Sequence, residues 1–98
     1  MRKAIISIRP CHAILILDGK KRVEHRLGRR CHFAAGDVLI IYETAPVSAV
    51  GGEVTVNRVE FDGHDSHIFL RNAHWYKHLL PLSRFGLKRP PQTYQFIA

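Results

Sequence analysis

The sequence has little of what would hold a small protein together by covalent bonds. Its 98 residues include only two cysteines, Cys11 and Cys31, whereas small secreted domains that rely on disulfides use several pairs. No apolar run approaches the roughly 18 residues that a membrane-spanning helix needs, and the N-terminal residues do not resemble a signal peptide. We therefore expect reduced thiols, no membrane partner and a cytoplasmic location.

The sequence also lacks internal repeats, low-complexity tracts and linkers. A chain of 98 residues is large enough for one hydrophobic core, although a domain of this size buries only about 60–65% of the surface of its unfolded chain. We expect a single domain that spans residues 1–98.

Acidic residues are scarce relative to basic ones. Fifteen lysines and arginines face eight aspartates and glutamates, which gives a formal net charge of +7, and the isoelectric point is near 10.0. Residues 1–30 hold nine basic side chains against two acidic ones, and residues 77–98 hold four against none. This excess favours a polyanionic partner such as nucleic acid. The alternative is a basic surface that only keeps the protein soluble.

Short apolar runs separated by glycine, proline and aspartate are typical of a mainly β fold with one or two short helices (α+β). The apolar run at residues 13–17 is compatible with a buried strand or a short helix. Pro10 and Gly19 favour a helix over residues 10–18, because proline suits a first helical turn and glycine a left-handed cap. Residues 72–80 are expected to form a short helix or an irregular loop. Strands are expected at residues 4–8, 38–42, 50–61, 68–70 and 93–97.

The long strand at residues 50–61 changes phase along its length. Its alternation places Val50, Val54 and Val56 on one face, whereas Val59 and Phe61 fall on the other phase. A β-bulge at residues 57–58 is the simplest explanation. Such kinks are common where a small sheet curls into a barrel.

Opposite charges are concentrated in residues 19–26, whose sequence is GKKRVEHR. The alternation of this segment predicts a strand with Arg22, Glu24 and Arg26 along one face. Charged side chains on one strand face need a ligand or an ion pair to satisfy them. We therefore regard this face as a candidate site.

The residue types of this segment suit several kinds of chemistry. Lys21 follows a glycine turn and can bind phosphate or, if desolvated, act as a general base. Glu24 can accept hydrogen bonds from an exocyclic amino group or transfer a proton, and Arg26 can hold phosphate or carboxylate. The alternative is a network that stabilises the fold, in which Glu24 pairs with Arg26 or Lys21.

Four motifs give the chain a resemblance to a known family. In order, they are SIRP at residues 7–10, GKKRVEHR at residues 19–26, YETAPVSAVGGE at residues 42–53 and RPPQTY at residues 89–94. With these motifs the chain resembles the ASCH domains of the PUA-like β-barrel superfamily. The resemblance covers residues 4–60 and 89–97. Residues 61–88 diverge from the family and are shorter than it implies.

The resemblance implies a small closed β-barrel and a cleft, next to its first helix, that binds RNA or a modified nucleoside. We expect no cofactor. Tyr42 would either stack against a base or pack in the core. The charge pattern and the resemblance together predict these ligand- or RNA-binding residues: Arg9, Lys20, Lys21, Glu24, Arg26, Arg29, Tyr42, Thr44 and Pro46.

A small amidohydrolase is the alternative function. Some relatives in the superfamily hydrolyse the acetyl amide of acetylcytidine, with the lysine and threonine of a Gly-x-Lys-x-x-Thr-x-Arg pattern as catalytic residues. This chain keeps Lys21 but has Glu24 in place of the threonine, so that activity cannot be carried over. If the protein is an enzyme, the resemblance implies Lys21, Glu24 and a further acid, for which Glu53 and Glu60 are available and Glu53 lies in the better-matched motif. A third possibility is a domain that keeps the fold and has lost its ligand.

Seven histidines raise the question of a metal site. Cysteine and histidine are adjacent at residues 11–12 and 31–32, and His74 and His78 would share a helix face at four-residue spacing. The spacing between the pairs matches no standard zinc module, and adjacent side chains on a strand point apart. We therefore expect no metal site.

Overall fold

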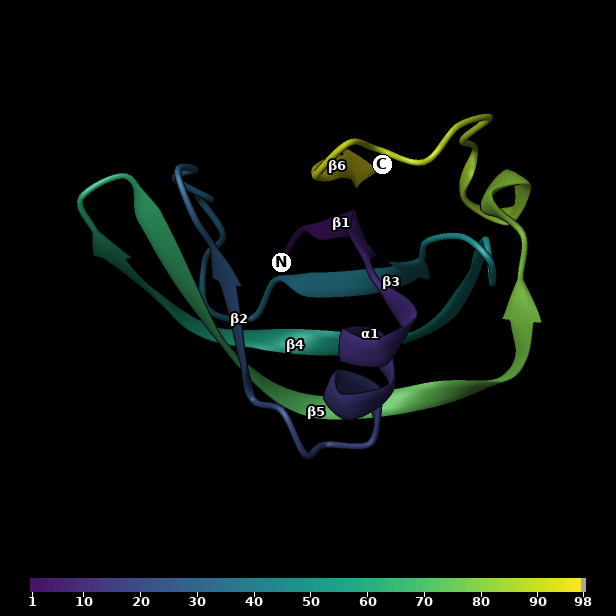
Figure 1. Ribbon diagram of the computed structural model, residues 1–98, viewed down its shortest axis with the longest axis horizontal. Coiled ribbons are helices and arrows are strands. Elements are labelled where there is room, and N and C mark those ends of the chain that lie inside the picture. The colour runs from purple at the N-terminus through teal and green to yellow at the C-terminus, as the bar shows by residue number, and fades with distance from the viewer. Residues whose placement is uncertain (98) are drawn as a thin grey trace.

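The computed structural model describes residues 1–97, which form one six-stranded mixed sheet with one α-helix and one short 3-10 helix (Figure 1). The strands lie in the order β2-β5-β4-β3-β1-β6; β1 pairs in parallel with β3, and the other neighbours are antiparallel. The mainly β fold with a short helix is thus confirmed. The elements are β1 (Lys3–Ile8), α1 (Pro10–Leu17), β2 (Val23–Arg26), β3 (Val38–Glu43), β4 (Ala49–Asp62), β5 (Asp65–Leu80), η1 (Leu82–Phe85) and β6 (Tyr94–Ile97).

The sheet is curved but not closed. β2 and β6 form its two edges, and no ladder joins them within residues 1–97, so the expected closed barrel is not confirmed. The β4–β5 hairpin follows a wide arc across the molecule (Figure 1). Its register shifts at three places, one of them between Val56 and Arg58. The slip predicted at residues 57–58 is therefore confirmed, and bulges of this kind bend a sheet.

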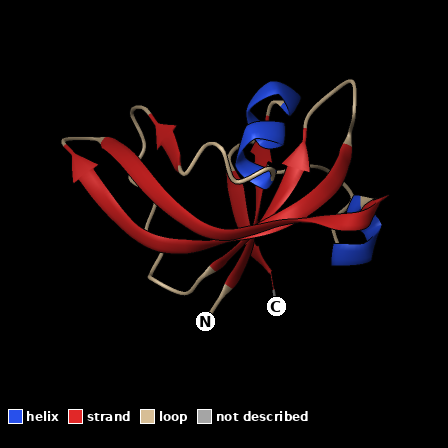
Figure 2. Ribbon diagram, turned by 90° about the horizontal axis from the view of Figure 1, so that it is seen from below, coloured by secondary structure: helices blue, strands red, loops and turns tan. Residues whose placement is uncertain are grey.

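Each face of the sheet carries its own core. On the helix face, α1 packs through Ile16 and Leu17 onto apolar side chains of β1, β3, β4 and β5. On the opposite face, a smaller cluster around Ile5, Ile40 and Tyr42 is covered by side chains of the segment that includes η1. Figure 2 shows α1 and η1 on different sides of the sheet.

Val50 lies on the opposite face, away from Val54 and Val56, so the prediction of one common face is wrong for this residue. The cause is a second bulge. In the β3–β4 ladder Ile41 pairs with Gly52 but Tyr42 pairs with Val50, which leaves Gly51 as an extra residue. One inserted residue reverses the direction of every side chain beyond it.

The helix predicted over residues 10–18 is confirmed as α1. Pro10 occupies its first turn, and the chain leaves it through Gly19, whose φ is +76°. The amides of Gly19 and Lys20 donate to the carbonyls of Ile16 and Leu15 at 3.0 and 2.9 Å. This pair of bonds is a Schellman cap. It turns the chain sharply, so residues 20–22 lead directly into β2.

Residues 72–80 belong to strand β5, so the expected helix or loop is wrong. β5 pairs with β4 as far as Leu80, opposite Val50. Asn72 has a φ of +54° and lies where the register shifts between Glu53 and Thr55 of β4. The extra residue interrupts the alternation by which a strand is recognised in a sequence.

No helix formed by residues 1–97 is long and apolar enough to cross a membrane.

Candidate functional site

A charged pocket of about 470 Å³ opens on the helix face, between the start of α1 and strand β2. We call it the charged cleft. Its floor and walls come from β1, α1, β2 and the loops that flank β2. It is lined by Ser7, Ile8, Arg9, His12, Lys21, Glu24, His25, Arg26 and Leu27.

Glu24 is a buried acid in the wall of this cleft, with 8% of its surface exposed. It pairs with Ile68 in the β2–β5 ladder, and Ile68 belongs to the helix-face core, so the Glu24 carboxylate points to the helix face. Its Oε1 accepts a hydrogen bond from Lys21 Nζ at 3.2 Å, and its Oε2 accepts one from Arg26 Nε at 3.0 Å. Each oxygen therefore has a cationic partner.

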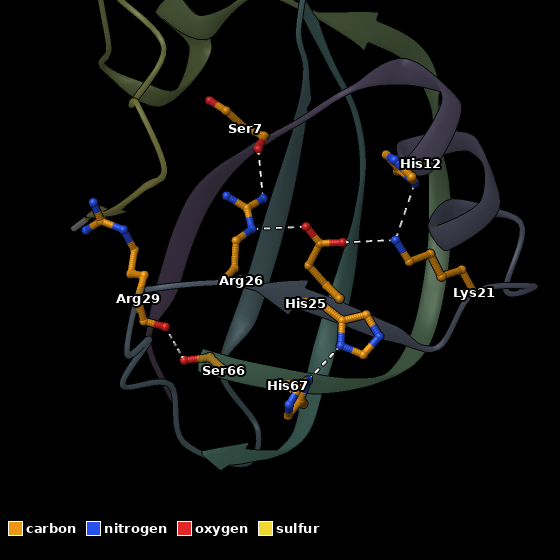
Figure 3. A network of polar contacts seen from close by, with 9 residues as sticks. Ser7, His12, Lys21, His25, Arg26, Arg29, Ser66 and His67 are labelled. Atoms are coloured by element: carbon orange, nitrogen blue, oxygen red, sulfur yellow. Dashed lines mark hydrogen bonds and ion pairs between the residues drawn. The ribbon is translucent and has the colours of Figure 1, made fainter. Parts of the chain in front are cut away.

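Lys21 and Arg26 connect this acid to other elements (Figure 3). Arg26 Nη2 donates to the carbonyl oxygen of Ser7 at 2.9 Å, and Lys21 Nζ lies 3.4 Å from His12 Nδ1. β1 and β2 are not neighbours in the sheet, and β2 is an edge strand. The Arg26 hydrogen bond therefore links two strands that no backbone ladder joins. The predicted pairing of Glu24 is confirmed for both cations, and the network contributes to the fold.

Not every residue predicted for the site reaches the cleft. Lys20 and Arg29 are exposed and do not line it. Figure 3 places Arg29 beyond Arg26, on the side away from Lys21. The predicted residues that line the cleft together are Arg9, Lys21, Glu24 and Arg26.

Arg22 departs from the predicted strand face. β2 begins only at Val23, and the Nε of Arg22 donates to the carbonyl oxygen of Gly19 at 3.4 Å. Arg22 lines a second pocket, which it shares with Lys21. The tight turn after α1, and not strand alternation, thus directs this side chain.

The loop after β3 contributes nothing to the cleft lining. Tyr42 is only 6% exposed and packs in the core of the opposite face, which favours core packing over base stacking. Thr44 donates its amide to the carbonyl of Ile8 at 3.0 Å. Pro46 is exposed and follows a cis peptide bond. Neither Thr44 nor Pro46 lines the cleft.

The acids considered for a hydrolase lie away from Lys21 and Glu24. Glu53 pairs with Ile40, a core residue of the opposite face, and its Oε1 accepts a hydrogen bond from Tyr76 Oη at 2.8 Å. Burial raises the pKa of Tyr76, and the hydrogen bond to Glu53 raises it further. Glu60 is exposed and pairs with Arg58 at 2.7 Å. Neither acid lines the charged cleft.

Sequence reasoning missed Ser7 and His12 as cleft residues. Ser7 is the first residue of the SIRP motif at residues 7–10, and His12 lies two residues beyond it. Of this motif, only Arg9 was predicted to bind a ligand. Ser7 also holds the C-terminal segment, because its Oγ donates to the carbonyl of Pro91 at 2.6 Å and its amide donates to that of Thr93 at 2.9 Å. The first and last motifs of the sequence therefore meet at the edge of the cleft.

Within residues 1–97, no three histidine, cysteine, aspartate or glutamate side chains gather closely enough to hold a metal ion. His25 and His67 face each other across β2 and β5, with 2.7 Å between their Nδ1 atoms. This contact requires that one of the two nitrogens carry no proton.

Comparison with known proteins identifies one family. The model of the ASCH domain matches residues 6–87 of the chain. No curated protein matches the chain.

Solved structures of an ASCH protein from Zymomonas mobilis have the same fold. The ASCH structure superposes with a TM-score of 0.81 at 22% identity, covering 98% of this chain and 87% of the other. Two mutant forms give TM-scores of 0.83 and 0.84 at 23% and 21% identity, covering 98% and 100% of this chain and 88% and 91% of theirs.

Proposed function

Because the chain belongs to the ASCH domain family, we propose that it binds RNA or a modified nucleoside in the charged cleft. The observation that carries the proposal is the Glu24 carboxylate, held between Lys21 and Arg26 in the wall of an open pocket. A buried acid with two fixed cations is a preorganised set of one acceptor and several donors. Such a set suits a ligand that combines an amino group with a phosphate.

The cleft as a whole is basic. Arg9, Lys21 and Arg26 line it against Glu24 alone, so its electrostatic potential attracts anions. Arg26 donates through Nε and Nη2, and no hydrogen bond within residues 1–97 uses its Nη1. This remaining donor and the guanidinium of Arg9 are suited to phosphate oxygens. Glu24 is then the group that accepts from an exocyclic amine.

The amidohydrolase alternative has less support. It needs a hydroxyl where this chain has Glu24, and the proposed assisting acid, Glu53, faces the other side of the sheet. The Lys21–His12 contact gives the cleft basic groups, but the hydroxyl of Ser7, which also lines the cleft, donates to the carbonyl of Pro91. Binding without turnover is therefore the simpler function for these residues.

The substitution Glu24→Gln tests the proposal. It keeps the size of the side chain but replaces a charged acceptor with an amide, so affinity for the best ligand in a panel of nucleosides and short RNAs should fall by about 1–3 kcal/mol. Lys21 and Arg26 keep 24% and 16% of their side-chain surface exposed, so water can solvate both and the loss of stability should be modest. Titration calorimetry measures the affinity and thermal unfolding the stability.

Glu60→Gln is the matched control. Glu60 undergoes the same chemical change and also loses an arginine partner, Arg58, but it does not line the cleft. We expect it to leave affinity unchanged. If Glu24→Gln unfolds much earlier yet binds every ligand normally when folded, Glu24 serves only the fold and the proposal is wrong.

A further inference from the structure

His12 lines the charged cleft, but the function proposed above gives it no role. It lies in the first turn of α1 and is exposed. Its Nδ1 atom lies 3.4 Å from Lys21 Nζ, a contact drawn in Figure 3. Within residues 1–97, no hydrogen bond or ion pair involves its other ring nitrogen, Nε2. That nitrogen is therefore available to a ligand.

The contact with Lys21 assigns different roles to the two ring nitrogens of His12. A lysine ammonium can only donate a hydrogen bond, so Nδ1 must accept it and the imidazole proton must lie on Nε2. An imidazolium has no acceptor and cannot make this contact. When the cleft holds no ligand, the contact between Lys21 and His12 therefore requires a neutral ring.

The charged and titratable groups that line the cleft with His12 come from the start of α1, the loop after it and β2. They are Arg9, Lys21, Glu24, His25 and Arg26. β1 contributes only Ser7 and Ile8 to the lining, and neither side chain ionises near neutral pH. The single acid already accepts hydrogen bonds from two of the cations, and His25 contacts His67 through its Nδ1.

A phosphate bound in the cleft changes the conditions for protonation of His12. Its negative charge offsets the repulsion between an imidazolium and the ammonium of Lys21. An imidazolium also donates a charge-assisted hydrogen bond to a phosphate oxygen, which is stronger than the bond that a neutral ring donates. Phosphate binding and protonation of His12 therefore favour each other.

We propose, resting on the function proposed above, that His12 binds the phosphate group of a nucleotide ligand and takes up a proton as it does so. Glu24 then accepts from the base, and His12 acts on the phosphate together with Lys21. The charged cleft thus prefers a nucleotide to the corresponding nucleoside, and this preference increases as the pH falls.

The test compares ligands with and without a phosphodiester. The probes are the four ribonucleosides and their cyclic monophosphates, whose diester keeps one charge, whereas a phosphate monoester ionises again near pH 6. Titration calorimetry at about pH 7.5 and about pH 5.5, in buffers of different ionisation enthalpy, gives affinity and proton uptake. We expect the affinity for the best cyclic monophosphate to rise about five- to tenfold at the lower pH, with proton uptake, and that for its nucleoside to change less than about twofold.

The substitution His12→Gln removes the titrating group. Glutamine suits an exposed helical position and keeps a hydrogen-bond donor, but it cannot take up a proton. We expect it to abolish the pH dependence and the proton uptake for the cyclic monophosphate and to leave nucleoside affinity unchanged. His78→Gln is the matched control, because His78 is also exposed but lies in β5 and does not line the cleft. It should bind as the unmodified protein does.

A second variant separates charge from proton uptake. His12→Arg is cationic at both pH values, so its affinity for the cyclic monophosphate should be high and constant; melting curves check the fold of each variant. Proton uptake that persists in His12→Gln, or cyclic monophosphates that bind no more tightly than nucleosides at the lower pH, overturns the role of His12. If nucleosides still bind in a manner that depends on Glu24, the proposed function survives this failure. If neither class of ligand binds, both proposals fail.

Discussion

At the scale of single residues, Asp37 and Glu43 are two buried acids whose pKa values the fold shifts in opposite directions. The carboxylate of Asp37 accepts hydrogen bonds from the amides of Arg2 and Ala34 at 3.0 and 2.9 Å and from Arg2 Nη2 at 3.0 Å. Burial alone would raise the pKa of Asp37, but these bonds outweigh it and hold the pKa below its ordinary value. The contribution of Asp37 to stability is therefore complete above its unfolded-state pKa and is lost as the pH falls through the folded-state value.

Asp37→Asn should consequently be most destabilising near neutral pH. The amide presents a donor where three donors converge, so we expect a loss of about 1–3 kcal/mol at pH 7. The difference from the unmodified protein should narrow below about pH 4, where the unmodified protein also loses the charged acceptor. Urea unfolding at several pH values measures it. A difference that stays constant as the pH falls would contradict the assignment.

The ionisation of Glu43 makes stability depend on pH in the opposite direction. It is 3% exposed, and burial raises the pKa of its carboxyl above the ordinary value. Ionisation is then easier in the unfolded chain, so stability falls as the pH rises from the ordinary pKa through the raised one. Gly51 leaves room for this group, because a side chain at that position would collide with Glu43 Oε2.

Glu43→Gln should therefore stabilise the protein at neutral pH. The amide avoids the cost of a buried charge, and we expect a gain of about 0.5–2 kcal/mol at pH 7 that shrinks toward pH 4. The same unfolding series measures it. A variant less stable than the parent at pH 7 would mean that the Glu43 carboxylate makes a favourable interaction that the amide cannot replace.

At the scale of elements, α1 is held against the hairpin by close approach at Gly52. A Cβ atom there would collide with the carbonyl oxygen of His74 and meet Leu17 and the backbone of Trp75. Trp75 in turn donates its Nε1 hydrogen to Asp18 Oδ1, at the end of α1, at 2.7 Å. Gly52 thus lets β5 and the helix pack on one point of β4.

Gly52→Ala should destabilise the fold by about 3 kcal/mol, because the backbone of β5 cannot yield as a flexible side chain would. Thr55→Ala is the control: it changes the same strand on the opposite side and should cost about 1 kcal/mol or less. Guanidinium unfolding measures both. Equal losses would show that the collision at Gly52 is relieved by a small shift.

The sequence predicted those elements whose limits are encoded locally. α1 was predictable because Pro10 and Gly19 mark its ends, and the strand at residues 4–8 because it is an unbroken apolar run. Of β5, only the strand at residues 68–70 was predicted, because the insertion at Asn72 hides the alternation of the residues that follow. The cleft residues Lys21, Glu24 and Arg26 were predictable, because all three belong to the charged motif at residues 19–26. Ser7 and His12 were not predicted, since only the packing of β1 and α1 beside β2 brings them to Lys21 and Glu24.

At the scale of the whole molecule, the basic charge is distributed unevenly around the cleft. Arg9, Lys21 and Arg26 line it, and Lys20 and Arg29 are exposed in the segments that flank β2. Residues 91–93 are bonded to Ser7, so the C-terminal basic segment approaches the same cleft. Lys20 and Arg29 are suited to contact the phosphates of a bound RNA outside the cleft without reading its sequence.

Reversing Lys20 and Arg29 together to glutamate should lower affinity for all RNAs alike and flatten the dependence of affinity on salt, because each lost phosphate contact lowers the slope by about 0.7–0.9. The control reverses Lys77 and Arg84, which lie at the far end of β5 and in η1. Both double variants change the net charge from +7 by four units, to +3, so a difference between them reports position and not total charge. Binding measured across a salt series should weaken much more in the first variant. Equal effects would mean that RNA affinity depends only on the overall charge of the protein. The basic residues around the cleft would then serve only to keep the protein soluble.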